Sequence, residues 1–327
     1  MTWTILPITD FHSVRASWDG LNERGPNSPA LHSDFYQALL GEFRSGADNI
    51  AVLGAIDAPE AMAILGHSKF GSWNTYQPAQ APLGAWLNAS ERPLQEILDS
   101  LARSLPGIVA KLGLTQLDPD IYPKPAGSRK LSNLDYIPTA RITLTGDFET
   151  YWSGRGKNLR HNIKRLRNKL AKENISTKLE VITTYDEVAH AVKAYGQLES
   201  SGWKAQGGTA IAGDNAQGRF YTNMLSAYAT RGHCRIFRLF FNGELVASDF
   251  CIDQGNTIII LKTTYSEHHA GNSPAMLMRH AALPDLFSNP QLHRLEFYGR
   301  VMDWHTKWSD EIRTLYHANL VRFPFIS

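Results

Sequence analysis

The segment CRIFRLFFNGELVASDFCID, residues 234–253, predicts a β-hairpin, and the rest of the fold can be built outward from it. Two largely apolar runs flank Asn242-Gly243, a dipeptide that favours the left-handed backbone of a two-residue hairpin turn. A helix-like segment precedes the hairpin, and a third strand, a helix and a fourth strand follow it; these segments are 220–228, 256–265, 273–287 and 294–299. We therefore expect an α+β unit in this half of the chain.

The first half of the chain repeats this order of elements. FYQALLGEF, residues 35–43, resembles FYTNMLSAY, residues 220–228. A strand pair with a turn at Ala58-Pro59-Glu60, a third strand, a helix and a fourth strand then follow in the same order. The repeat predicts a duplicated α+β unit, with lobes at 1–140 and 141–327 and a loop-rich join near 118–135. Because this order of elements also occurs in unrelated folds, a chance likeness is the alternative.

Composition limits the classes of protein that the chain can belong to. Of its 327 residues, 43% are hydrophobic, and no window approaches the roughly 18 uninterrupted apolar residues of a membrane span. The N-terminus shows no basic leader followed by an apolar run, as a signal peptide would. Cys234 and Cys251 lie in apolar, strand-like runs and make no zinc pattern, so we expect buried thiols in a cytoplasmic protein.

Positive charge is concentrated in RGKNLRHNIKRLRNKLAK, residues 155–172, which holds eight Lys or Arg and no acid. The whole chain has a net charge of only +2, so the charge is local. The apolar residues of this stretch have the spacing of one stripe of an α-helix; they are Leu159, Ile163, Leu166 and Leu170. The basic residues then cover the sides and the outer face, which is either simply solvated or binds an anionic partner.

Three further stretches carry residue types that are suited to binding or catalysis. In YSEHHAGNSPAMLMRHA, 265–281, a strand leads through a Gly loop to a helix that begins with Ser273-Pro274, an arrangement that favours anion binding but is common in many folds. Trp203 and Lys204 suit a sugar or a nucleotide, although the Trp can equally be part of a core. Residues 294–311 crowd ionisable and aromatic side chains at a strand end, which indicates either a site or a loop packed over the sheet.

Taken in order, the basic helix, Gly202-Trp203-Lys204, the Gly-loop helix and the Phe297-Tyr298-Gly299 segment that leads to Lys307-Trp308 resemble one family. They resemble the CelD-type acetyltransferases, named for cellulose biosynthesis, a bacterial branch of the GNAT superfamily. The resemblance covers about residues 140–323. The CelD-type branch is also similar to the Fem-type peptidyl transferases, which contain two GNAT-like units. The resemblance implies a tandem GNAT-like fold in which helices flank a central mixed β-sheet in each of two lobes.

The resemblance also implies an activity. We expect an N- or O-acyltransferase that takes an acyl group, expected to be acetyl, from coenzyme A. The acceptor would be a cell-envelope or exopolysaccharide precursor, or a related small amine or sugar with an anionic group, acylated directly in a ternary complex. A Fem-like transferase that uses aminoacyl-tRNA and a non-catalytic binding protein with a degenerate fold are the alternatives. We expect no metal, no DNA and no transmembrane segment, while peripheral membrane contact stays open.

Site residues follow from the same resemblance. The pyrophosphate loop of the family reads Arg/Gln-x-x-Gly-x-Gly/Ala, and the aligned residues here are His268, Gly271 and Ser273, so His replaces Arg or Gln and Ser replaces the last small residue. The residues expected to contact the cofactor are Lys262, His268, Ala270, Gly271, Asn272 and Ser273. The expected catalytic residues are Asp249 and Glu296 as bases, and Tyr265 and Tyr298 as proton donors to the thiolate. The expected substrate contacts are Arg160, Lys164, Trp203, Lys204, His305 and Lys307. We expect the basic helix to lie at the other end of the lobe from the Gly loop.

Overall fold

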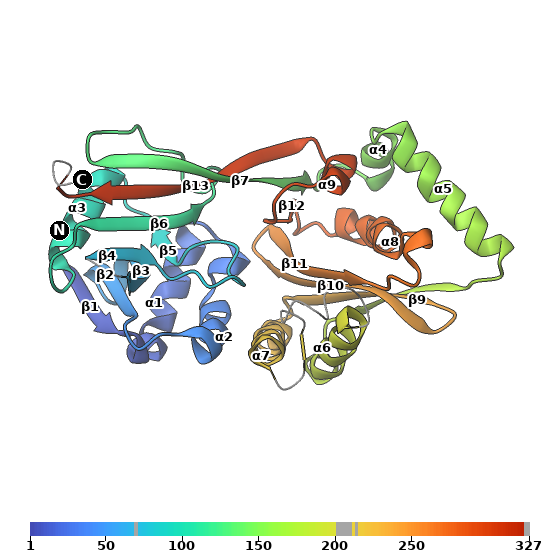
Figure 1. The fold of residues 1–327 in the computed structure, drawn as a ribbon, viewed down its shortest axis with the longest axis horizontal. Coiled ribbons are helices and arrows are strands. Elements are labelled where there is room, and N and C mark those ends of the chain that lie inside the picture. Colours follow the sequence, from blue (N-terminus) through green and yellow to red (C-terminus); the bar gives the residue numbers. More distant parts are fainter. Residues whose placement is uncertain (69–70, 201–210, 213–214, 324–327) are drawn as a thin grey trace. The chain divides into compact units, whose positions relative to one another are not determined.

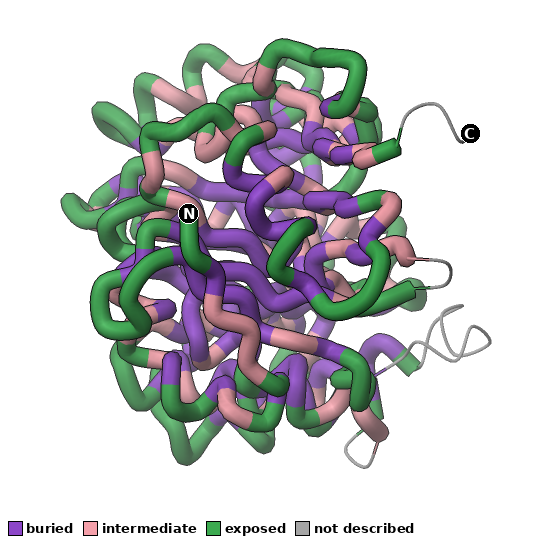
Figure 2. The backbone as a smooth tube through the Cα atoms, turned by 90° about the vertical axis from the view of Figure 1, so that its left-hand side faces the viewer, coloured by how far each residue is buried: buried purple, intermediate pink, exposed green. Residues whose placement is uncertain are grey.

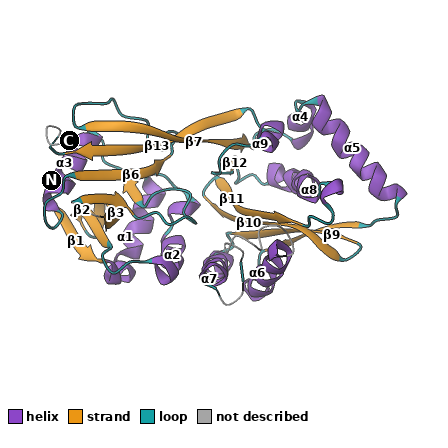
Figure 3. Cartoon of the chain, viewed as in Figure 1, coloured by secondary structure: helices purple, strands orange, loops and turns teal. Residues whose placement is uncertain are grey.

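The computed structural model describes residues 1–68, 71–200, 211–212 and 215–323. Its contacts divide the chain into two units, Met1–Thr139 with the described part of Arg313–Ser327, and Ala140–Ile312. The sequence placed residues 313–327 with the second lobe, whereas strand β13 (Glu311–Val321) pairs with strand β6 (Lys111–Leu117) of the first unit. Each unit combines helices with a mixed sheet, so the predicted α+β fold class is confirmed (Figures 1 and 3).

In the first unit, the strands follow one another in the order β1-β2-β3-β4-β6-β13, and β5 pairs with β3. The other elements of this unit are β1 (Trp3–Pro7), α1 (Phe11–Arg24), α2 (Ser33–Phe43), β2 (Asn49–Ala55), β3 (Ala58–Ser68), β4 (Ser72–Thr75), β5 (Trp86–Asn88) and α3 (Leu94–Ser104). The turn between β2 and β3 occupies residues 56–57, where Ala55 pairs with Ala58. The prediction of a turn at Ala58-Pro59-Glu60 was therefore wrong by two to three residues, because the apolar pattern does not fix the end of a strand.

In the second unit, the order is β7-β12-β11-β10-β9-β8. Its elements are the end of β7 (Leu131–Thr143), α4 (Phe148–Ser153), α5 (Lys157–Lys172), β8 (Thr177–Ile182), α6 (Tyr185–Ser200), α7 (Ala216–Thr230), β9 (Cys234–Phe241), β10 (Glu244–Gln254), β11 (Thr257–Tyr265), α8 (Pro274–Ser288), β12 (Arg294–Glu296) and α9 (Asp303–Trp308). The predicted hairpin is β9–β10, and Asn242 and Gly243 turn with φ of 47° and 85°, as the two-residue turn requires.

The two units share one pattern of strand pairing, which supports the duplication. In the first, β2–β3 and β3–β4 are antiparallel and β4–β6 is parallel; in the second, β9–β10 and β10–β11 are antiparallel and β11–β12 is parallel. The last strand of each pattern, β6 or β12, also pairs antiparallel with one further strand. These further strands are exchanged with respect to their order in the sequence: β7, which follows β6, pairs with β12, and β13, which follows β12, pairs with β6.

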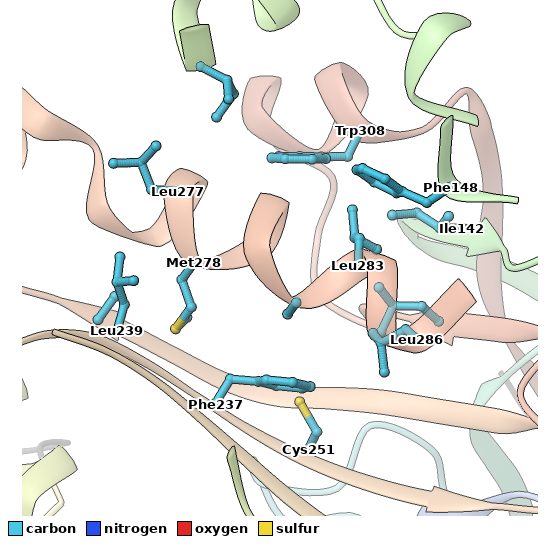
Figure 4. Packing of buried hydrophobic residues seen from close by; sticks show 14 of the residues in the cluster. Ile142, Phe148, Phe237, Leu239, Cys251, Leu277, Met278, Leu283, Leu286 and Trp308 are labelled. Carbon is cyan, nitrogen blue, oxygen red and sulfur yellow. The ribbon is translucent and has the colours of Figure 1, made fainter. Parts of the chain in front are cut away.

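Each unit has its own hydrophobic core, and in Figure 2 the central strands are buried beneath exposed outer segments. In the second unit, α8 lies on the sheet with Met278 above Phe237 and Cys251, while Leu283 lies beside Ile142 and Phe148 (Figure 4). Burying a side chain of this size contributes about 1.5–3 kcal/mol, which holds α8 on the strands. The predicted stripe of α5 is confirmed, since Leu159, Ile163, Leu166 and Leu170 are buried in the same core.

Both cysteines are free and buried, as the sequence predicted. Among the helices of the described residues, none combines the length and the apolar character that crossing a membrane would need.

Candidate active site

The end of β12 marks a divergence between two parallel strands. β11 pairs with β12 over only three residues, Thr257 to Ile259, with Glu296 opposite Ile259 in the last pair. β11 then continues to Tyr265, while the chain after Glu296 turns through Tyr298, whose φ of 48° lies in the left-handed region. A non-glycine residue in this region costs on the order of 1–3 kcal/mol, and such positions cluster at functional sites. The divergence leaves one side of residues 260–265 outside the β11–β12 ladder.

The loop between β11 and α8 contains most of the residues predicted to contact the cofactor. Residues 270–272 form a 3₁₀ turn, and Ser273 follows at φ 46° and ψ 56° before α8 begins at Pro274. The predicted helix start is therefore correct, but the Ser273 side chain makes no capping hydrogen bond. The N–H groups of Ala270, Asn272 and Ser273 donate to carbonyl groups within the loop, so an anion could reach them only if the turn opens.

The basic helix α5 reaches this loop directly. Lys169 Nζ donates to Asn272 Oδ1 at 2.7 Å, and Asn162 Nδ2 lies 3.6 Å from Met276 Sδ near the start of α8. The expectation that the basic helix lies far from the Gly loop was therefore wrong, because the apolar stripe of α5 packs against α8 and brings Lys169 to the turn. The sequence showed Lys169 only as one of eight similar cations.

Asp249, on β10, lies beneath α8 in a buried ion pair. Arg279 Nη2 of α8 donates to Asp249 Oδ2 at 3.2 Å, and the two residues are 5% and 3% exposed. Burial raises the pKa of Asp249, while the Arg279 charge and a hydrogen bond from Thr263 oppose the rise. Arg279 also lies over the Trp304 ring, 4.5 Å from its centroid. This ion pair ties α8 to the sheet.

Glu296 is fully buried at the point where β11 and β12 diverge. Its Oε1 lies 3.7 Å from Arg294 Nε, and its backbone is opposite Arg141 of β7. Among the predicted proton donors, Tyr298 is buried just beyond this strand end, whereas Tyr265 is 45% exposed at the end of β11. The structure thus places Glu296, Tyr265 and Tyr298 on the segments that border the divergence.

Lys262 lies on the side of the sheet that α6 and α7 cover. Its Nζ lies 3.0 Å from Glu199 Oε1 and 5.6 Å from the centroid of the Tyr221 ring. Glu199 also accepts a hydrogen bond from the backbone N–H of Ile211 at 2.9 Å. Lys262 therefore stabilises a buried carboxylate on the face opposite to Asp249, a contact that the sequence did not reveal.

The remaining predicted residues are dispersed. His305 is buried, stacks on Trp304 at 3.5 Å and accepts a hydrogen bond from the Met302 N–H at 3.0 Å; burial and the nearby Arg279 lower its pKa to about 4. His268 is exposed, with its ring 5.2 Å from that of His269. Trp203 and Lys204 lie outside the described residues.

Two cavities flank α5, and they separate the predicted substrate contacts. One, of about 500 Å³, is lined by Phe148, Glu149, Trp152, Ser153, Arg160, Ile163, Lys164, Arg167, Asn168 and His280. The other, of about 660 Å³, is lined by Gly154, Arg155, Gly156, Asn158, Leu159, Asn162, Met276, Thr306, Lys307 and Asp310. Arg160 and Lys164 thus share the first cavity, while Lys307 belongs to the second. Within the part of the chain that the structure describes, no group of three or more His, Cys, Asp or Glu is arranged to hold a metal ion.

Comparison with known families agrees with this geometry. Residues 157–306, which run from the start of α5 into α9, match the model of the acetyltransferase (GNAT) domain. The matched segment lies within the second unit, and the match agrees with the GNAT-like fold that the sequence predicted. A search of curated proteins gave no match.

Solved structures show the same fold over nearly the whole chain. The C-terminal domain (DUF2156) of a putative lysylphosphatidylglycerol synthetase from Agrobacterium fabrum superposes with a TM-score of 0.61 at 12% identity, covering 94% of this chain and 92% of that one. FemX gives a TM-score of 0.61 at 9% identity, covering 98% of each chain. L-PGS from Bacillus licheniformis gives 0.54 at 12% identity, covering 93% and 90%. At identities this low, the similarity to these structures establishes the fold alone.

Proposed function

We propose that the protein is an acyl-CoA-dependent N- or O-acyltransferase that transfers an acetyl group directly to its acceptor in a ternary complex. The observation that carries this proposal is the divergence of β11 from β12 beside α8, within the segment that matches the GNAT domain. The CelD-type resemblance supports a cell-envelope or exopolysaccharide precursor as the acceptor. We place the reaction in the cytoplasm, in keeping with two free, buried thiols.

In this proposal the thioester lies along residues 260–265 of β11, where backbone N–H groups stabilise the oxyanion that forms when the acceptor attacks. The pyrophosphate lies at residues 270–273, once the turn has opened. Gly271 gives the backbone freedom for that change. Lys169 supplies a cation at Asn272, while His268 stands where the family motif has Arg or Gln. Lys262 stays a proposed cofactor contact through its partly exposed side chain.

Each proton that moves in the proposed reaction is assigned to a residue of this chain. The acceptor nitrogen or oxygen attacks the thioester carbonyl, and its proton passes to Glu296, directly or through one water. The tetrahedral intermediate then expels the thiolate of coenzyme A, which takes a proton from Tyr265 or Tyr298. Asp249 is the second candidate base, and its carboxylate accepts a hydrogen bond from Arg279. The acceptor is held by Arg160 and Lys164, and Trp203, Lys204, His305 and Lys307 are further proposed contacts.

The alternative donor is aminoacyl-tRNA, as in Fem-type enzymes. The likeness to FemX favours it at the level of the fold, while the basic face of α5 offers charge for an RNA backbone. A binding protein without catalytic activity is the third reading. A direct binding measurement distinguishes the two donors, because only acyl-CoA-dependent transfer requires a coenzyme A site.

Gly271→Val tests the donor site. A Cβ at position 271 would meet no protein atom within 4 Å, so the fold should tolerate the substitution. We expect it to abolish acetyl-CoA binding in a calorimetric titration, because a β-branched side chain blocks the path of the pyrophosphate and stiffens the turn. Gly46→Val is the matched control, since its Cβ would also meet nothing within 4 Å and it lies in the first unit. If Gly271→Val binds acetyl-CoA as the parent does, the loop is not the donor site.

A further inference from the structure

The cavity between α4, α5 and α8, of about 500 Å³, is lined by three cations, by aromatic side chains and by one acid, Glu149. Arg160, Lys164 and Arg167 are spaced by four and three residues, which puts them along one side of α5. In the described residues, none of these three cations forms an ion pair with an acid. Three neighbouring like charges repel one another, and the cavity sets only one acid, Glu149, against them, so a ligand that carries two or more negative charges would offset the remaining cost.

The flat side chains that line the cavity pack against one another. The rings of Trp152 and His280 meet edge to face at 4.4 Å, and Phe148 is stacked near Trp152 at 6.0 Å. Arg167 Nη2 lies 3.0 Å from His280 Nδ1. Burial and the Arg167 charge lower the pKa of His280 to about 4, so near neutral pH its ring is uncharged and Nδ1 accepts the hydrogen bond that orients Arg167. The guanidinium is therefore held at the cavity before any ligand arrives.

We propose that this cavity binds a nucleoside diphosphate, the carrier portion of an activated sugar. The two phosphates contact Arg160, Lys164 and Arg167, because guanidinium and ammonium groups make strong, charge-assisted hydrogen bonds to phosphate oxygens. The base lies against Trp152, because every base offers a flat π-face to an aromatic side chain. The identification of this ligand as the acceptor rests on the proposed function. Its binding to the cavity does not.

The test is a calorimetric titration of the full chain with uridine diphosphate, inorganic pyrophosphate and uridine. We expect uridine diphosphate to bind more tightly than either pyrophosphate or uridine. Arg160→Gln with Lys164→Gln should weaken uridine diphosphate at least ten-fold, because each lost bond to a charged group is worth about that factor. Trp152→Leu should weaken uridine diphosphate and leave pyrophosphate unchanged. The control is Arg165→Gln with Lys172→Gln, which removes the same charge from the same helix outside both cavities.

Four results would overturn the proposal. Equal losses in the two double variants would mean that only the general charge of α5 matters. Pyrophosphate binding as tightly as uridine diphosphate would mean that the cavity contacts the phosphates alone and not the base. Competition by coenzyme A would assign the cavity to the donor. Binding of acetyl-CoA without binding of uridine diphosphate would remove this inference and leave the proposed function intact, whereas the reverse pattern would remove the proposed function alone.

Discussion

Asp249→Asn is expected to lower the free energy of unfolding by about 3–5 kcal/mol, because it leaves the Arg279 guanidinium buried beneath α8 without its counter-charge. For a unit of this size the loss corresponds to a fall in melting temperature of roughly 6–20 °C. Thermal and urea unfolding of the purified variant would measure it. The size of the effect follows from burial, since an exposed pair of the same geometry would contribute at most about 1 kcal/mol.

A double substitution separates this explanation from a catalytic one. Asp249→Leu combined with Arg279→Met removes both charges, and replacing a buried pair by apolar side chains is often neutral or stabilising. We therefore expect the double variant to recover most of the stability that Asp249→Asn loses. An Asp249→Asn protein that melts within about 2 °C of the parent but turns over at least 10²-fold more slowly would identify Asp249 as the general base instead.

Glu296→Gln is expected to lower turnover by a factor of about 10² to 10⁴, the usual contribution of a positioned general base. Gln keeps the shape of the side chain and cannot accept a proton, so acetyl-CoA affinity should stay within about two-fold of the parent's. The measurement is the release of free coenzyme A thiol from acetyl-CoA with an amine or sugar acceptor that the parent protein uses. Full activity in Glu296→Gln would exclude it as the base, and loss of the folded state would make it a structural carboxylate.

The elements that the sequence predicted well are those that local patterns define. Asn242-Gly243 specifies its own turn, the four apolar residues of α5 specify which face is buried, and Ser273-Pro274 marks the start of α8. Each of these depends on residues that lie close together in the sequence. The repeat of the two halves was visible for the same reason, as a recurrence of local elements in one order.

The exchange of β7 and β13 between the units was not predicted, because nothing in a strand's own residues states which remote strand it pairs with. The contact of Lys169 with Asn272 depends in the same way on how α5 is rotated against α8. Arg279 could have been noticed, since it is a lone cation in the apolar helix SPAMLMRHAALPDLF and therefore needs a buried partner. Arg160 and Lys307 could not have been separated, because which cavity each lines depends on packing.

The most direct measurement is a calorimetric titration of the full chain with acetyl-CoA, with longer acyl-CoAs and with charged tRNA. We expect a single saturable site for acetyl-CoA, weaker binding of the longer acyl-CoAs, no saturable binding of charged tRNA, and loss of the acetyl-CoA site in Gly271→Val. Saturable binding of charged tRNA together with no heat from any acyl-CoA would contradict acyl-CoA-dependent transfer and assign the protein to the aminoacyl-tRNA-dependent class.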